Sequence, residues 1–306
     1  MAKVNYLLVK RKIGIFAICI NITSNKDKKI VIVNNLVTRA LSGAIYVAAM
    51  ISAIVSENTI LFACIFTVTL AMGLREFYSL CKNINGANPL DKLCIVAGII
   101  AFLCSIVAPV YGFYAFLPFW AILFIAEVFR KGENPMHNLA FGLLGLMYVA
   151  FPFCCMSQIW QMGYYYLLAF YIFVWVSDTG AYCSGKLFGK HKMCERISPK
   201  KTWEGTTGGL VFSLIAGYIA SNLITGVNNP LGLSTGLWML FAATSFAIGT
   251  LGDLVESVFK RYLGIKDSGK FLPGHGGVLD RFDSALLGAP FILFLLTAIK
   301  LCSEML

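Results

Sequence analysis

Apolar segments long enough to cross a lipid bilayer recur along most of this 306-residue chain. A membrane-spanning helix needs about 20 predominantly apolar residues, and only helices and closed barrels satisfy their backbone polar groups inside lipid. Nine candidate spans lie at residues 40–56, 58–74, 93–109, 111–129, 136–160, 163–183, 205–226, 234–255 and 280–302. Hydrophobic residues make up 58% of the sequence and charged residues only 13%, unlike an average soluble domain. The sequence therefore predicts an all-α polytopic membrane protein.

The basic residues indicate how these spans cross the membrane. Of the 25 Lys and Arg, all but Lys300 lie in five stretches, at residues 1–39, 75–92, 130–135, 184–204 and 256–281. The connectors near residues 57, 110, 161 and 230 carry none. Nine spans and a cytoplasmic N-terminus place all five stretches in the cytoplasm, as the positive-inside rule requires, whereas eight or ten spans would divide them. The net charge of +10 is therefore a topological signal, and no nucleic acid is needed to explain it.

The chain is expected to form one integral-membrane domain, residues 34–306, preceded by a poorly ordered cytoplasmic extension, residues 1–33. The apolar run at 13–20 is too short for a signal peptide and lacks a cleavage site after it. The ten cysteines show no metal-ligand spacing. Two sizeable hydrophilic connectors, 184–204 and 256–281, both fall on the predicted cytoplasmic side, and we expect function where they meet.

Residues 257–283 lie between two apolar segments and read SVFKRYLGIKDSGKFLPGHGGVLDRFD. They combine basic residues, glycines and aspartates. Basic side chains and the NH groups of a Gly-rich loop bind phosphate, and clustered carboxylates hold a divalent cation. A membrane protein with all three at one bilayer face is suited to phosphate chemistry at the lipid surface. The chain has no Walker A, GxGxxG, GxSxG or HExxH motif.

Five polar residues at the end of the eighth span share one helical face, since their spacing is i, i+3, i+4, i+7 and i+8. They are Asp253, Glu256, Ser257, Lys260 and Arg261. An i,i+4 ion pair accounts for Glu256 with Lys260. It does not account for Asp253, which follows the apolar run TSFAIGTLG and would be costly near hydrocarbon. We therefore expect a functional role for Asp253.

Asp280 and Asp283 stand at i and i+3 at the start of the last span. Capping is one explanation, because the helix macrodipole favours acidic groups at this end. Two carboxylates on one face repel, however, unless something positive lies between them. We favour a Mg²⁺ site made by Asp253, Asp280 and Asp283, which leaves positions for phosphate oxygens and water.

The loop between these two clusters contains Pro273 and three glycines, including Gly276 and Gly277. Glycine allows backbone geometry that exposes NH groups to a ligand. A plain turn would explain the Pro and Gly residues, but not the flanking cations Lys260, Arg261, Lys266 and Lys270. His275 either contacts phosphate or supports the loop, and both readings stay open.

The other connector ends in Ser198-Pro199-Lys200-Lys201-Thr202-Trp203-Glu204-Gly205. Ser198 and Pro199 suit the N-cap and the first position of a helix. Lys200 and Lys201 then occupy the first turn, where helix NH groups add to their attraction for an anion. Upstream, Asp178 is another carboxylate at membrane depth, and we favour a functional role for it over a buried structural hydrogen bond.

The chain resembles the phosphatidate cytidylyltransferases, also called CDP-diacylglycerol synthases. Residues 257–283 match S-x-apolar-K-R-x4-K-D-x-G-x2-apolar-P-x-H-G-G-apolar-x-D-R-apolar-D at every fixed position, and residues 177–190 and 196–205 are similar to the family's upstream blocks. The resemblance covers about 165–300; the N-terminal half agrees mainly in being hydrophobic. It implies transfer of CMP from CTP to phosphatidate, giving CDP-diacylglycerol and pyrophosphate, with Mg²⁺ and room for a second cation.

The residues fit this reaction as two predicted groups. The expected catalytic residues are Asp253, Lys260, Arg261, Lys266, Asp267, Asp280, Arg281 and Asp283. The expected substrate-binding residues are Asp178, Ser198, Lys200, Lys201, Glu204, Ser257, His275, Gly276 and Gly277. In this assignment the cations after the eighth span neutralise the CTP triphosphate, and Lys200 with Lys201 holds the lipid phosphate.

The predicted partners are CTP, phosphatidate and the lipid bilayer. The sequence leaves the oligomeric state open, with a homodimer as one of the possible assemblies. The predicted location is the bacterial inner membrane, with the active site facing the cytoplasm. A related CTP-dependent lipid transferase is the nearest alternative. An ion-coupled transporter would also bury Asp178 and Asp253, but it would not need a Gly-rich loop ringed by cations. An inactive scaffold would be expected to have lost a carboxylate, and none is missing here.

Overall fold

The computed structural model describes residues 43–84, 86–108, 112–226, 229–269 and 276–305. In these ranges the chain is almost entirely helical, with one antiparallel hairpin made by β1 (Lys192–Cys194) and β2 (Ser198–Thr202). The predicted extension at 1–33 and the loop residues Lys270 and His275 lie outside the described residues.

A helix occupies each of the nine predicted span positions in the described part of the chain. In chain order they are Gly43–Val55, α2 (Thr59–Cys81), α3 (Asp91–Val107), α4 (Phe116–Phe129) after the short η1 (Gly112–Ala115), a continuous rod made of α5 (Pro135–Gly145), η2 (Leu146–Ala150) and α6 (Phe151–Met162), α7 (Tyr164–Phe188), α8 (Trp203–Leu223), α9 (Thr235–Tyr262) and α10 (Leu279–Met305). Within the described residues, six are long and apolar enough to cross a membrane: α2, the α5–α6 rod, α7, α8, α9 and α10. The all-α membrane fold is therefore as predicted, and the count of nine crossings stays a prediction.

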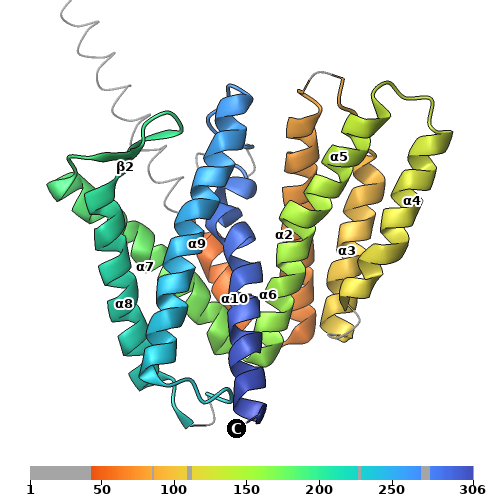
Figure 1. Ribbon diagram of the computed structural model, residues 1–306. Helices are drawn as coiled ribbons and strands as arrows, with labels where there is room; N and C mark the ends of the chain where they lie inside the picture. The colour runs from red at the N-terminus through yellow and green to blue at the C-terminus, as the bar shows by residue number, and fades with distance from the viewer. Residues whose placement is uncertain (1–42, 85, 109–111, 227–228, 270–275, 306) are drawn as a thin grey trace, which may run out of the picture.

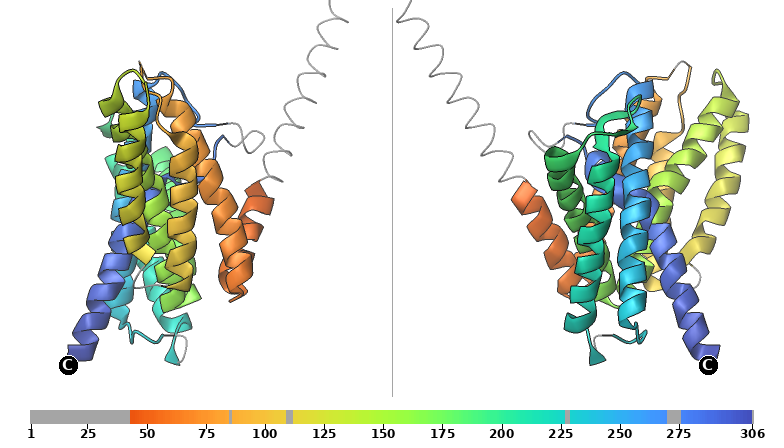
Figure 2. Two further views of the ribbon diagram at one scale, coloured as in Figure 1. Left: turned by 90° about the vertical axis from the view of Figure 1, so that its right-hand side faces the viewer. Right: turned by 60° about the vertical axis from the view of Figure 1, so that its left-hand side comes forward.

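The connections between helices fall at two opposite ends of the bundle (Figure 1). The α2–α3 and α4–α5 connections, the β hairpin and the chain leaving α9 lie at the upper end of the view, and the α8–α9 connection and the C-terminus lie at the lower end. Both views of Figure 2 show the same separation. The described connectors that carry the basic residues thus share one end, which the positive-inside rule requires of cytoplasmic loops.

Aromatic packing fixes α10 against the rest of the bundle. Phe282 is 1% exposed, and its ring centroid lies 5.2 Å from that of Phe153 on α6. The Tyr171 ring of α7 meets it edge-on at 6.3 Å. Such aromatic pairs stabilise beyond the area they bury. Because Phe282 stands between Asp280 and Asp283, its packing determines where both carboxylates lie.

Close helix contacts bring the predicted site segments together. A Cβ on Gly252 of α9 would lie 2.6 Å from the Asp283 carbonyl oxygen of α10. On α8, a Cβ on Gly209 would lie 2.9 Å from the Ser177 carbonyl oxygen of α7. Small residues at such crossings allow membrane helices to approach closely. As a result α7, α8, α9 and α10 meet next to Asp178, Asp253 and Asp283.

The helix start predicted at Ser198 is wrong. Residues 198–202 form β2, in which Thr202 lies opposite Lys192 and Ser198 opposite Cys194. The helix α8 begins after Thr202, whose side-chain oxygen accepts a hydrogen bond from Gly205 N at 3.1 Å and so acts as the N-cap. The physical reason is that β1 supplies backbone partners to this stretch, while Thr202 offers an equally suitable capping oxygen later in the chain. Lys200 and Lys201 therefore lie on a strand.

Candidate active site

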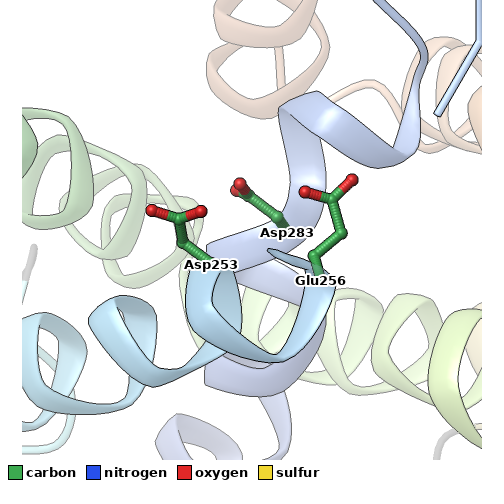
Figure 3. A group of neighbouring side chains, drawn as sticks. All are labelled: Asp253, Glu256 and Asp283. Carbon is green, nitrogen blue, oxygen red and sulfur yellow. The ribbon is translucent and has the colours of Figure 1, made fainter. Parts of the chain in front are cut away.

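Three carboxylates meet where α9 packs on α10. Asp253 and Glu256 project from one face of α9, and Asp283 projects from the first turns of α10 (Figure 3). One oxygen from each lies within 4.8 Å of the others. The polar face predicted from the sequence, residues 253–261, is present, since α9 is one continuous helix through Tyr262. The close approach of α10 at Gly252 brings the third carboxylate, Asp283, to this face.

This carboxylate cluster has the donor chemistry of a hard divalent cation site. Glu256 is 3% exposed, and its Oε1 is buried without a hydrogen-bond partner in the described structure. A buried, unpaired carboxylate oxygen is costly, and like charges this close repel. A cation with oxygen ligands would relieve both costs. The cluster Asp253–Glu256–Asp283 could therefore hold a metal ion.

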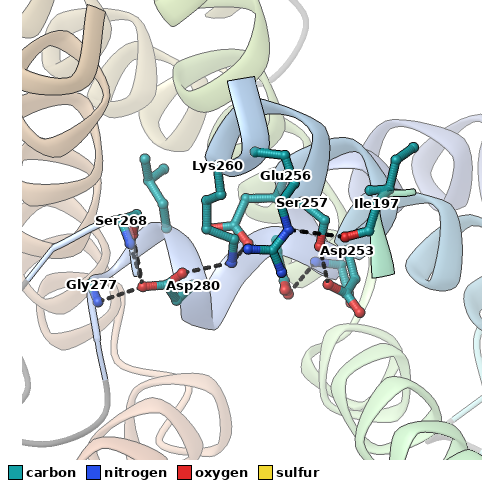
Figure 4. A network of polar contacts seen from close by, with 12 residues as sticks. Ile197, Asp253, Glu256, Ser257, Lys260, Ser268, Gly277 and Asp280 are labelled. Atoms are coloured by element: carbon teal, nitrogen blue, oxygen red, sulfur yellow. Dashed lines mark hydrogen bonds and ion pairs between the residues drawn. The ribbon is translucent and has the colours of Figure 1, made fainter. Parts of the chain in front are cut away.

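Asp280 lies outside that cluster, although the sequence grouped it with Asp253 and Asp283. Its Oδ1 is 2.8 Å from Lys260 Nζ, and its Oδ2 accepts hydrogen bonds from Ser268 N and Gly277 N, each at 2.8 Å (Figure 4). Both oxygens are thus engaged with protein donors. The structure places Glu256, and not Asp280, beside Asp253 and Asp283, and the metal role predicted for Asp280 stays a prediction.

Lys260 connects the two groups of carboxylates. Its ammonium contacts Glu256 as well as Asp280, and its side chain is only 15% exposed. The i,i+4 ion pair expected on α9 is therefore present. Sequence reasoning missed Glu256 as a cluster member because that ion pair already explained it. Its i+3 spacing from Asp253 was the available signal.

The two hydrophilic connectors meet at the cluster. Lys201 Nζ of β2 is 2.7 Å from Asp253 Oδ2 and donates to the Thr250 carbonyl oxygen at 3.2 Å. Arg261 Nε, just beyond the cluster on α9, donates to the Ile197 carbonyl oxygen at 3.2 Å (Figure 4). These contacts join the hairpin to the end of α9.

A pocket of about 380 Å³ opens beside the cluster, between α7, β2, α8 and α9. Its charged lining residues are Asp178, Lys186, Lys200, Lys201 and Asp253. Three of these are cations, so the pocket presents positive charge next to the carboxylates. Lys186 was not among the predicted site residues. Lys186 follows Asp178 by eight residues, which is about two helical turns, so both fall on one face of a helix. That spacing was a signal that could have identified it.

The remaining predicted site residues lie around this centre in different roles. Ser257 Oγ donates to Asp253 Oδ1 at 3.4 Å. Glu204, in the first turn of α8, accepts from Lys190 N at 3.1 Å and from His191 N at 3.2 Å, so it binds the chain just before β1.

Four other predicted residues lie in the first turn of α10 or in the chain before it. Lys266 and Asp267 are exposed after α9, and Arg281 is exposed on α10 itself. Gly276 has a φ of 83°, which glycine adopts readily. His275 lies outside the described residues.

Comparisons with a family profile and with curated proteins point to the same family. The profile of the Cytidylyltransferase family matches residues 37–299. Three curated relatives carry the name phosphatidate cytidylyltransferase. That of Staphylococcus saprophyticus is 42% identical over 180 residues, which is 58% of this chain and 66% of the relative. That of Staphylococcus haemolyticus is 41% identical over 177 residues, 57% of this chain and 65% of the relative. A Staphylococcus aureus relative is 42% identical over 171 residues, which is 55% of this chain and 63% of the relative. Each match spans just under two thirds of the relative's length.

Proposed function

This chain belongs to the cytidylyltransferase family, and we propose that it transfers CMP from CTP to phosphatidate, giving CDP-diacylglycerol and pyrophosphate. The names of its curated relatives support this reaction. The observation that carries it is the contact between Lys201 and Asp253. It joins a pocket lined by cations to a carboxylate cluster, inside a bundle of apolar helices.

The proposed chemistry needs charge neutralisation more than proton transfer. A phosphate oxygen of phosphatidate attacks the α-phosphorus of CTP and forms a new P–O bond. The bond from that phosphorus to the bridging oxygen breaks, and pyrophosphate leaves with the electron pair. The nucleophile is already anionic at neutral pH, so no general base is required. The barrier is the approach of two polyanions, and preorganised positive charge lowers such barriers.

The described side chains assign the parts of this task. Asp253, Glu256 and Asp283 would hold Mg²⁺, and bound Mg²⁺ supplies positive charge to the CTP phosphates and to the leaving pyrophosphate. Lys260 keeps Glu256 and Asp280 in place through its two ion pairs. Lys200, Lys201 and Lys186 line the pocket where a phosphate would be bound. Lys201 also orients the Asp253 carboxylate.

We further propose nine membrane crossings with this site on the cytoplasmic face of a bacterial inner membrane. The support is the shared end of the basic connectors (Figure 1) and the bacterial relatives. Phosphatidate would then reach the pocket from the cytoplasmic leaflet, and CTP from the cytoplasm.

The test is a transfer assay. Membranes that contain the chain are incubated with labelled CTP, phosphatidate and Mg²⁺, and the expected product is a lipid-soluble cytidine compound. Membranes without the chain are the control. A product formed from another lipid phosphate or from a lipid alcohol, but not from phosphatidate, would indicate a related transferase. Absence of any lipid-soluble product would contradict the proposal.

A further inference from the structure

Glu76 lies on α2, in the half of the chain outside the signature segments, yet its carboxylate reaches the start of α10. Its Oε2 accepts a hydrogen bond from Leu279 N at 3.1 Å, and Leu279 is the first residue of α10. The first NH groups of a helix have no partner within the helix. Negative charge is also favourable at this end. Glu76 therefore caps α10 from a helix about 200 residues earlier in the chain.

The same carboxylate fills the space between two backbone segments. A Cβ on either Gly269 or Gly277 would collide with Glu76. The two segments also touch each other, because a Cβ on Gly277 would lie 2.7 Å from Gly269 N. Only glycine permits this approach at both positions. Glu76 thus joins α2 to the chain leaving α9 and to the chain entering α10.

Asp280 binds the same two segments from the other side. It accepts from Ser268 N and from Gly277 N, while it contacts Lys260 of α9. Glu76 and Asp280 therefore act on one small structure, the entry to α10. A displacement of this entry would move Asp280 directly, and Asp283 with it on the same helical turn.

The helix that carries Glu76 is a firm support. Its neighbours on α2, Phe77 and Tyr78, are 6% and 0% exposed. Tyr78 Oη donates to the Gly142 carbonyl oxygen of α5 at 2.9 Å. Buried packing and a buried hydrogen bond on a long helix keep Glu76 in place better than a loop would.

We propose that Glu76 is a positioning residue for the active site. It holds the first turn of α10 so that Asp280 meets Lys260 and Asp283 faces Asp253 and Glu256. In the part of the chain described, no basic side chain forms an ion pair with Glu76. Glu76 accepts from the backbone NH group of Leu279, which is the pattern of a cap and not of a surface ion pair. The activity readout of this proposal rests on the proposed function.

The experiment compares Glu76→Gln with Glu127→Gln. Glutamine keeps the size and one acceptor oxygen, and removes the charge. Glu127 on α4 is a matched control, because it is 5% exposed and accepts from Asn138 Nδ2 at 2.7 Å, away from the carboxylate cluster. We expect both variants to melt at lower temperature in detergent. Only Glu76→Gln should lower kcat, by about tenfold, as the loss of a charged hydrogen bond does. It should also raise the Mg²⁺ concentration for half-maximal rate.

Amide hydrogen exchange on the metal-free protein gives a readout that does not depend on activity. Glu76→Gln should speed exchange in residues 276–283, and Glu127→Gln should speed it at the start of α5 instead. Unchanged exchange in 276–283, or an equal shift of the Mg²⁺ requirement in both variants, would overturn the proposal. If the unsubstituted chain shows no transfer activity, the proposed function fails while the exchange comparison still tests Glu76.

Discussion

At the residue scale, Asp283 offers the most direct test of the carboxylate cluster. Asp283→Asn removes one negative charge and almost no volume, so the variant should insert and fold. The loss of a major electrostatic contribution to the transition state predicts a fall in transfer rate of at least ~10²-fold. The measurement is the rate at saturating CTP, phosphatidate and Mg²⁺.

Asp91→Asn is the control for that loss. Asp91 begins α3 and pairs with Lys82 at 2.6 Å in a partly exposed position, where surface ion pairs contribute about 0–1 kcal/mol. Its transfer rate should stay normal. Near-normal activity of Asp283→Asn at saturating Mg²⁺ would reduce Asp283 to a helix-capping role.

Lys201 and Lys260 contact different carboxylates of the cluster, Asp253 and Glu256, which predicts different kinetic effects. Lys201 lines the pocket beside α7 and α8, whereas Lys260 lines a small cavity with Phe77 and Leu279. Removing one charged hydrogen bond costs about 1.5–3 kcal/mol, a factor on the order of ten to a hundred. Lys201→Ala should therefore raise the apparent KM for phosphatidate by such a factor. Lys260→Ala should mainly raise that for CTP, because Lys260 holds Glu256 in the cluster proposed to bind the metal ion that the CTP phosphates would contact.

Kinetics in mixed micelles with both substrates varied decide this point. Lys82→Ala is the control. Lys82 pairs with Asp91 at 2.6 Å on the α2–α3 connection, a distance close to the 2.7 Å between Lys201 and Asp253, and its loss should change neither KM. Equal shifts of the same KM in Lys201→Ala and Lys260→Ala would mean that the phosphates share one undivided pocket.

At the scale of elements, the β hairpin determines how α8 begins and where Lys201 points. Thr202 ends β2 and caps α8, so Thr202→Ala should lower stability by about 1 kcal/mol and also lower transfer. Ser234→Ala removes the cap of α9, where Ser234 accepts from Leu237 N at 3.4 Å at the opposite end of the bundle. It should lower stability alone. Melting in detergent and the transfer assay separate the two, and equal activity loss would mean that the hairpin does not position the site.

At the scale of the whole molecule, the arrangement of connectors predicts that the two ends of the bundle are accessible from opposite sides of the membrane. Lys192 is exposed in β1, and Thr225 is exposed after α8. Lys192→Cys should react with an impermeant thiol reagent only from the cytoplasm, and Thr225→Cys only from outside. The background should carry serine at the exposed cysteines among the described residues, Cys64, Cys183 and Cys302. Labelling of both new cysteines from one side would contradict the nine-crossing topology.

The sequence by itself determined the features that depend on neighbouring residues. Apolar segment length predicted the helices, because a bilayer requires internally satisfied backbone. The 3.6-residue period placed Asp253, Glu256 and Lys260 on one face of α9. The ion pair of Glu256 with Lys260 followed from the same spacing. The motif between 257 and 283 indicated the family, which the match over residues 37–299 confirms.

The start of α8 shows where local pattern was insufficient even at short range. Ser198 and Thr202 are both acceptable caps, and the choice between them depends on whether β1 pairs with the residues in between. A strand partner that lies several residues upstream decides this choice. Propensity at a single position does not.

Only the tertiary structure decided which distant groups meet. Asp283 lies beside Asp253 and Glu256. Asp280 instead pairs with Lys260 and accepts hydrogen bonds from two backbone NH groups. Lys201 reaches Asp253, and Glu76 reaches Leu279. The spacing along each helix specifies which residues share a face. The rotation and distance of that face relative to another helix come from packing at positions such as Gly252 and Phe282, where side chains distant in sequence must fit together.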